Sequence, residues 1–244
     1  MAGILELKNI SFTTQNRAII RDFSHQFEEG TTTALVGPSG CGKSTVLKLC
    51  AGILIPMSGE VLFRGKDVFG MNRQENLAFR KEGAMVFQDS ALWANQNLFE
   101  CLELPLRIHY PNMTPREREN RIQAVLRDVG YKRDLSIRPA QLSMGEQKLI
   151  AFARALICWP KMLFLDEWTE SLDDSAAQRL IGLVRKHQSD KHTIIFISHD
   201  LRIIRSIADY VLMILGGQFF LKFTRKQMEE DEDLAQYVEN GIAS

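Results

Sequence analysis

The 244-residue chain lacks an excess of charge and lacks long apolar runs, and both absences limit what it can do. Thirty basic residues balance thirty acidic ones, so the overall charge gives no reason to expect a nucleic-acid partner. Uninterrupted apolar stretches such as Tyr210–Leu215 are far shorter than the roughly 20 residues that a membrane-spanning helix needs. If the protein works at a membrane, we expect a partner to do the spanning.

Paired cysteines and a secretion signal are also lacking. The four cysteines, at positions 41, 50, 101 and 158, form no C-x-x-C pair and no metal-type cluster with histidine. The expectation is therefore reduced thiols in a cytosolic compartment. The first residues, "MAGILELKNI", contain no basic region followed by an apolar run, so no signal peptide is predicted. No internal repeat, low-complexity segment or linker is evident.

The apolar periodicity predicts strands that alternate with helices, as in a mainly parallel α/β sheet. Residues 4–12 alternate as a half-buried strand does, and a second strand runs to about Phe27. A helix is predicted over Lys43–Leu54, ended by Pro56 and the residues after it. Buried strands are predicted at Thr31–Gly37, Gly83–Gln88, Met162–Asp166, Thr193–Ser198 and Tyr210–Leu215.

Between Ala91 and Trp159 the pattern is mainly helical, as if a helical block were inserted into the α/β core. Thr114 and Glu117 form a capping box with Pro115 at the first helical position, which predicts a helix start. Ser143 and Glu146 form the same S-x-x-E box, and the apolar residues that follow have core spacing until the chain reaches Pro160. On this evidence alone, the segment 142–147, "LSMGEQ", is simply the beginning of a helix.

A phosphate-binding loop is the clearest chemical motif. The segment Gly37–Ser44, "GPSGCGKS", matches G-x-x-x-x-G-K-[ST] and lies between a predicted strand and a predicted helix, the context that such a loop requires. Its backbone N–H groups and the helix dipole favour a phosphate, Lys43 can reach the β- and γ-phosphates, and the Ser44 hydroxyl can bind Mg²⁺. The predicted nucleotide-binding residues are Gly37, Pro38, Ser39, Gly40, Cys41, Gly42, Lys43, Ser44 and Thr45.

Polar residues follow three other predicted strands. Asp166 can hold Mg²⁺ from the end of its strand, and Glu167 beside it can act as the general base on the attacking water. An Asp-Glu pair after a strand is also a common way to begin a helix, and the phosphate loop favours the catalytic interpretation. Gln88 and His199 also stand at strand ends, where they can sense the γ-phosphate or simply cap and pack.

The ordered set of motifs resembles an ABC-type ATPase over essentially the whole chain. The motifs are the phosphate loop, Gln88, "LSMGEQ" (142–147), "LFLDE" (163–167), "SLDD" (171–174) and "SHD" (198–200). The resemblance implies ATP and Mg²⁺ as ligands, with Lys43, Glu167 and His199 catalytic and with Ser44, Gln88 and Asp166 at the metal. It also implies a head-to-tail dimer in which Ser143 and Gly145 approach the ATP of the partner and Asp173 lines the dimer seam.

The same resemblance implies a P-loop NTPase (RecA-like) fold: a mainly parallel sheet, an N-terminal antiparallel β subdomain and an inserted helical subdomain. The expected ATP-binding core comprises residues 1–88 and 160–228, with the helical subdomain at 89–159. Residues 229–244 form a tail that either docks on the partner subunit or packs on its own domain. The sequence departs from the family pattern at Thr14, where an aromatic usually stacks on adenine, at Trp168 in place of proline, and in the variant signature with Met144 and Glu146.

Residues 89–109 and 234–243 resemble the ATPases of MCE-type phospholipid transport systems. This implies a subunit at the cytoplasmic face of the inner membrane that drives phospholipid movement between envelope membranes, together with a permease and an MCE-domain substrate-binding protein. The alternatives are the ATPase of an amino-acid or metal importer and a soluble iron–sulfur-assembly ATPase, whose signature also has glutamate after the glycine. A DNA-binding chromosome-maintenance ATPase is excluded, because about 100 residues between the loop and the signature cannot supply its long coiled coils.

Overall fold

The computed structural model describes residues 3–15 and 17–243, with side chains through residue 239. Its first sheet is antiparallel and has the strand order β2-β1-β4-β5. These strands are β1 (Gly3–Thr14), β2 (Arg17–Glu28), β4 (Ser58–Phe63) and β5 (Lys66–Asp67). The predicted alternation fails at Ile4, which is buried beside Leu5, and then holds from Leu5 to Leu7. A bulge with Asn9 at φ +51° shifts the register and keeps Ile10 buried.

The second sheet has six strands in the order β10-β9-β3-β8-β7-β6. Its strands are β3 (Thr32–Val36), β6 (Gly83–Val86), β7 (Met162–Asp166), β8 (Thr193–Ile197), β9 (Tyr210–Leu215) and β10 (Gln218–Thr224). Neighbours are parallel except β9 and β10, which are antiparallel. The carboxyl ends of β3, β6, β7 and β8 therefore lie at one edge of the sheet, where ligands bind in open α/β folds.

Each face of the six-stranded sheet has its own apolar core, because side chains alternate along a strand. Ala34 and Val36 pack into a cluster under the later helices, whereas Leu35 between them packs into a cluster with the first sheet and the first helix. The helices are α1 (Lys43–Cys50), α2 (Arg73–Glu82), α3 (Leu98–His109), α4 (Pro115–Val129), α5 (Met144–Leu156), α6 (Asp174–Ser189), α7 (Leu201–Ile207), α8 (Arg225–Glu230) and α9 (Glu232–Ala243), with short 3₁₀ turns at Val68–Gly70 and Pro139–Gln141.

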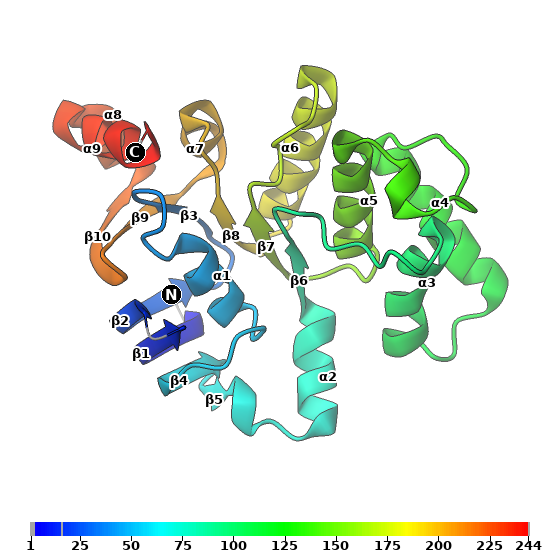
Figure 1. The fold of residues 1–244 in the computed structure, drawn as a ribbon, viewed down its shortest axis with the longest axis horizontal. Helices are drawn as coiled ribbons and strands as arrows, with labels where there is room; N and C mark the ends of the chain where they lie inside the picture. The colour runs from blue at the N-terminus through cyan, green and yellow to red at the C-terminus, as the bar shows by residue number, and fades with distance from the viewer. Residues whose placement is uncertain (1–2, 16, 244) are drawn as a thin grey trace.

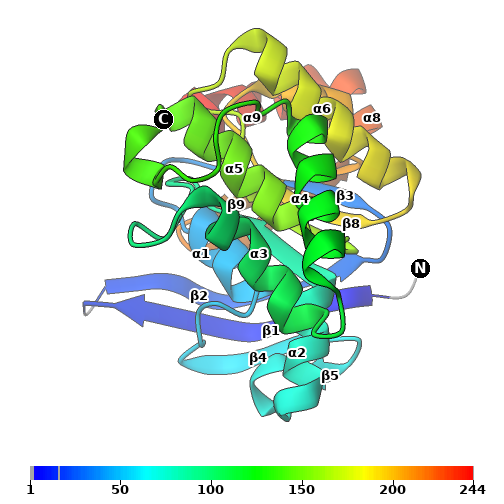
Figure 2. The same ribbon diagram turned by 90° about the vertical axis from the view of Figure 1, so that its right-hand side faces the viewer.

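The helices α3, α4 and α5 gather at one end of the molecule, and the antiparallel sheet lies at the other end below α1 (Figures 1 and 2). Both predicted capping boxes in this block are present: Thr114 with Glu117 begins α4, and Ser143 with Glu146 begins α5. The predicted fold class is confirmed, since a mainly parallel sheet, an antiparallel sheet and a helical group are all present. The residue limits proposed for the subdomains stay a prediction.

Two predicted element ends differ from the structure, and one helix was not predicted. Helix α1 ends at Cys50, four residues early, because Gly52 turns into the left-handed region with φ +63°. Helix α2 was not predicted, although Asn72 and Glu75 form a capping box at its start. Strand β6 ends at Val86 and lies at the sheet edge, so Gln88 belongs to the segment after the strand.

The C-terminal helix α9 packs on its own chain along one side. Val238 is completely buried in the larger core, and Leu234 packs against that core, whereas Tyr237 is 58% exposed. The acidic run Glu229–Asp233 is exposed, as expected of a solvated segment. Among the residues described, no helix combines the length and apolar character needed to cross a bilayer.

Candidate functional site

The phosphate-loop turn connects β3 to α1 and can be built only with glycine at two positions. Gly42 has φ +105°, and a Cβ there would lie 2.6 Å from the Ile20 side chain. At Gly37, with φ +145°, a Cβ would lie 2.2 Å from the carbonyl oxygen of Ile214. At both positions a side chain would be strained by the positive φ and would also clash with a neighbouring strand. Glycine therefore lets the loop pack closely against β2 at Ile20 and β9 at Ile214.

Two side chains at the start of α1 point into the loop and toward β7. Lys43 Nζ donates hydrogen bonds to the carbonyl oxygens of Gly37 at 2.6 Å and Pro38 at 3.0 Å. Ser44 Oγ donates to Asp166 Oδ1 at 3.1 Å, across 122 residues of sequence. Burial raises the pKa of Asp166, which is 2% exposed, and the hydrogen bond from Ser44 opposes that rise. The loop and the end of β7 therefore form one polar site.

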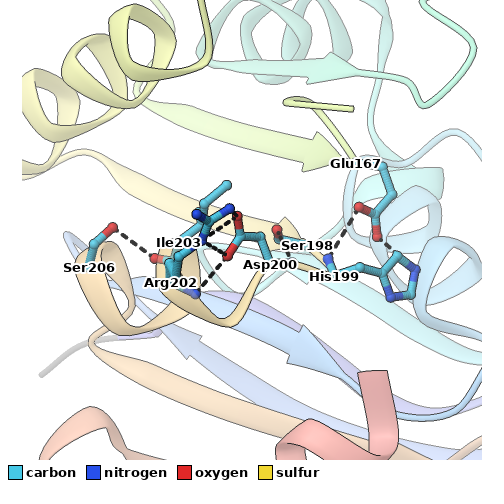
Figure 3. A network of polar contacts seen from close by, with 7 residues as sticks. All are labelled: Glu167, Ser198, His199, Asp200, Arg202, Ile203 and Ser206. Carbon is cyan, nitrogen blue, oxygen red and sulfur yellow. Dashed lines mark hydrogen bonds and ion pairs between the residues drawn. The ribbon is translucent and has the colours of Figure 1, made fainter. Parts of the chain in front are cut away.

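Glu167 follows β7 directly and contacts His199, which follows β8 (Figure 3). The His199 backbone N–H donates to Glu167 Oε2 at 3.3 Å, and His199 Nε2 lies 3.1 Å from Glu167 Oε1. Burial raises the pKa of the Glu167 carboxyl, and the adjacent imidazole opposes this effect. A raised pKa at a buried carboxylate in such a cleft suits a base that accepts a proton from water.

The backbone at Glu167 is strained, with φ +44° in the left-handed region for a non-glycine residue. Strain of this kind persists only where the surrounding structure fixes it, and it is common at functional sites. The next residue, Trp168, is fully buried, and its ring packs on Phe152 with centroids 5.7 Å apart. The residue that follows Glu167 is therefore anchored in the apolar core.

The phosphate loop and the residues after β7 and β8 line one cavity of about 430 Å³. Most of the predicted loop residues line it together with Gln88, Glu167 and His199. Thr14, Arg17, Ile19 and Ile197 also line it, so the described residues near the position expected for adenine include no aromatic ring. Phe12, two residues before Thr14, packs instead against the core of the first sheet.

The predicted signature residues lie outside this cavity. Ser143 is exposed at the N-cap of α5, where its Oγ accepts from the Glu146 N–H at 3.2 Å and Glu146 Oε2 accepts from the Ser143 N–H at 2.9 Å. Gly145 lies so close to the next loop that a Cβ would be 2.8 Å from the carbonyl oxygen of Ser171. Asp173 caps α6 by accepting from the Ala176 N–H at 2.8 Å.

Sequence reasoning missed several side chains around the site. Lys148 is only 3% exposed and bonds the carbonyls of Phe87 and Gln88, while Glu170 Oε2 accepts a 3.4 Å hydrogen bond from Gln88 Nε2. One signal was available, because Lys148 stands four residues before the core residue Phe152 on the same helix face. Arg17 gave no signal, since its place in the cavity wall depends on how β1 and β2 pair.

Comparisons with known proteins agree with this geometry. The family described as ABC transporter matches residues 20–170. The chain is 32% identical over 237 residues to the intermembrane phospholipid transport system ATP-binding protein MlaF of Haemophilus influenzae, covering 95% of this chain and 88% of that protein. It is 37% identical over 206 residues to the nickel import ATP-binding protein NikE of Brucella suis, covering 83% of this chain and 77% of that protein.

Solved structures give the same result. One is described as the dimeric structure of a post-hydrolysis state of the ATP-binding cassette MJ0796 bound to ADP and Pi. It superposes with a TM-score of 0.84 at 26% identity and covers 91% of this chain and 98% of that chain. With the phosphate loop, Asp166, Glu167 and His199 at one edge of the sheet, the chain belongs to the ABC transporter family of ATP-hydrolysing cassettes.

Proposed function

We propose that the 430 Å³ cavity binds ATP with Mg²⁺ and that Glu167 accepts a proton from the attacking water. The loop N–H groups and Lys43 bind the β- and γ-phosphates. Ser44, Asp166 and Gln88 offer the all-oxygen donor set that Mg²⁺ prefers, and the ion neutralises charge on the phosphates. The observation that carries this proposal is the 3.1 Å contact between Ser44 Oγ and Asp166 Oδ1, next to Glu167.

His199 has two roles in this proposal. Its backbone N–H, 3.3 Å from Glu167 Oε2, and its imidazole, 3.1 Å from Oε1, orient the base. Its side chain is also half exposed toward the cavity, where Nδ1 of the imidazolium can donate a hydrogen bond to the γ-phosphate while Nε2 faces Glu167. The imidazole thereby links the water-activating carboxylate to the phosphoryl group that the water attacks.

We infer that two copies pack head to tail and that Ser143 and Gly145 complete the partner's site. The exposed N-terminus of α5 lies outside the chain's own cavity, and a helix N-terminus favours an anion. The similarity to a structure described as dimeric supports the formation of a dimer. Asp173 would then lie at the seam, because Gly145 touches the loop just before it.

A second cavity is our candidate for the site where a permease docks. This groove of about 450 Å³ lies between α2, β6 and α3, and its lining combines Met85, Trp93 and Pro105 with the cations Arg80 and Arg154. An apolar floor with basic groups fits a short amphipathic helix that carries an acidic residue. We propose that a cytoplasmic helix of an integral membrane permease occupies it, at the cytoplasmic face of the inner membrane.

The substrate that we propose is phospholipid, moved between envelope membranes by a complex that includes an MCE-domain protein. The similarity to MlaF, over 95% of this chain, supports this choice, together with the segment 89–109 beside the groove. Nickel import is the second candidate, because the similarity to NikE is of comparable strength. The two proposals require different partner proteins, so isolation of the complex separates them.

The test is co-purification of the tagged chain with the products of its neighbouring genes. We expect a permease and an MCE-domain protein in the complex, and we expect Trp93→Glu, in the groove, to lose them. Phe220→Glu is the matched control, because Phe220 is also an exposed aromatic, at 54%, but lies on β10 away from the groove. Isolation of the chain without any integral membrane protein would contradict the proposal, and a nickel-binding partner would favour the second candidate.

Nucleotide selectivity is expected to be loose. Because Thr14 stands at the cavity wall instead of an aromatic ring, ATP and GTP are expected to differ in Kd by less than about tenfold. Thr14→Tyr should tighten both by about tenfold or more, since stacking contributes roughly 1–3 kcal/mol per base. Displacement of a fluorescent nucleotide measures both values, and a hundredfold preference for ATP in the unaltered chain would refute the expectation.

A further inference from the structure

Lys148 is buried at the junction of three parts of the site. It lies on α5, five residues after Ser143, and is 3% exposed. Its Nζ donates to the carbonyl oxygen of Gln88 at 2.5 Å and to that of Phe87 at 3.4 Å. Burying an ammonium group is unfavourable unless it is paired and hydrogen-bonded, so these carbonyls stabilise both the lysine and the segment that carries them.

A second cation on the same helix binds the next residues of that segment. Arg154 donates to the carbonyl oxygens of Ser90 at 3.0 Å and Ala91 at 2.6 Å. Ser90 and Ala91 are both left-handed, with φ of +63° and +43°. Two consecutive non-glycine residues in this region persist only where their surroundings fix them. The segment Phe87–Ala91 is thus attached to α5 through four carbonyl groups.

The surroundings of Lys148 on the other side are acidic. Glu170, Asp166, Asp89 and Glu167 all contribute favourable charge at its ammonium, and Gln88 Nε2 in turn donates to Glu170 Oε2 at 3.4 Å. The backbone carbonyl of Gln88 is therefore hydrogen-bonded to Lys148 on α5, and its side-chain amide is hydrogen-bonded to Glu170 in the loop after β7. Both attachments keep Gln88 in the wall of the cavity that also contains Ser44 and Glu167.

We propose that Lys148 is a positioning residue that holds Gln88 where its side chain can bind the Mg²⁺ of ATP. The inference rests on the proposed role of Gln88 at the metal. Because the same helix begins at Ser143, a displacement of the signature by a neighbour's nucleotide would move Gln88 with it. Occupation of one site would then change metal binding in the other through a single helix of this chain.

The test is a double-mutant cycle on the purified full chain with Lys148→Met and Gln88→Ala. Methionine has a similar length and suits a buried position but cannot bond the carbonyls. Each single variant is expected to lower kcat by roughly tenfold or more and to raise the Mg²⁺ concentration that gives half-maximal hydrolysis. Since Lys148 acts through Gln88, the double variant should be no slower than the slower single variant.

A control separates positioning from loss of stability. Ile150→Val alters a fully buried side chain of the same helix and is expected to lower the Tm without changing the Mg²⁺ dependence. If Lys148→Met behaves in that way, or if the effects of the two variants multiply, the inference is wrong while the role of Gln88 stands. If Gln88→Ala leaves the Mg²⁺ dependence unchanged, both the inference and the proposed role of Gln88 fail.

Discussion

Replacing Glu167 by glutamine is expected to slow ATP hydrolysis by about 10²- to 10⁴-fold without weakening ATP binding, the usual range for loss of a general base. The amide keeps the size of the side chain but cannot accept the proton of the attacking water. It retains an oxygen for the His199 N–H, so the geometry of the end of β7 is expected to survive. Phosphate release under saturating ATP measures the rate, and a filter assay with labelled ATP measures binding.

The same variant should also reveal the inferred dimer, because ATP that is bound but not hydrolysed would hold the two copies together. We expect a shift from monomer to dimer on size-exclusion chromatography with ATP and Mg²⁺, and no shift with ADP. Glu117→Gln is the matched control, since that carboxylate serves only the capping box of α4. Near-normal turnover in Glu167→Gln would remove Glu167 from the role of base.

Ser143→Asp is expected to abolish hydrolysis while the helix α5 remains intact. Aspartate caps a helix about as well as serine, so it can still accept from the Glu146 N–H, and only the hydrogen bond that Ser143 Oγ donates to Glu146 Oε2 is lost. The added negative charge, however, would face the γ-phosphate of the partner's ATP and oppose closure of the dimer. ATP binding to the chain's own loop should be unchanged, because Ser143 does not line that cavity.

Thr114→Ala supplies the comparison for a purely structural cap. Its loss is expected to cost about 1 kcal/mol of folding free energy, seen as a lower Tm, with hydrolysis retained. Glu146 is held by Arg133 Nη1 at 2.9 Å as well as by Ser143, so the start of α5 has a second support. If Ser143→Asp hydrolyses ATP at the normal rate, Ser143 is only a helix cap and the inferred dimer geometry is wrong.

Much of the candidate site could be predicted from the sequence because its signals are local. The phosphate loop needs a strand, glycines at fixed spacing and a helix, all within about 20 consecutive residues. Asp166 and Glu167 were predictable because a parallel strand places the residues after its end at one edge of the sheet. The capping boxes of α4 and α5 were predictable because their signal is local: each box needs only four consecutive residues.

The attachments between these parts could not be predicted from sequence. Lys148 contacts the carbonyl of Gln88, 60 residues away, and any residue type offers such a carbonyl. Beyond the end of β6 at Val86, the carbonyls of the chain bond Lys148 and Arg154 instead of a neighbouring strand, which a pattern of apolar residues alone does not reveal. Thr14 and Arg17 likewise meet the phosphate loop only because the two sheets pack together.

The burial of Trp168 also affects the intrinsic tryptophan fluorescence of the protein. Of the three tryptophans, Trp93 and Trp159 are 41% and 50% exposed, whereas Trp168 is fully enclosed beside Phe152. Emission from Trp168 is therefore shielded from water and from dissolved quenchers, and emission from the other two is not. The chain thus carries an intrinsic fluorophore one residue from its proposed general base, where no dye needs to be attached.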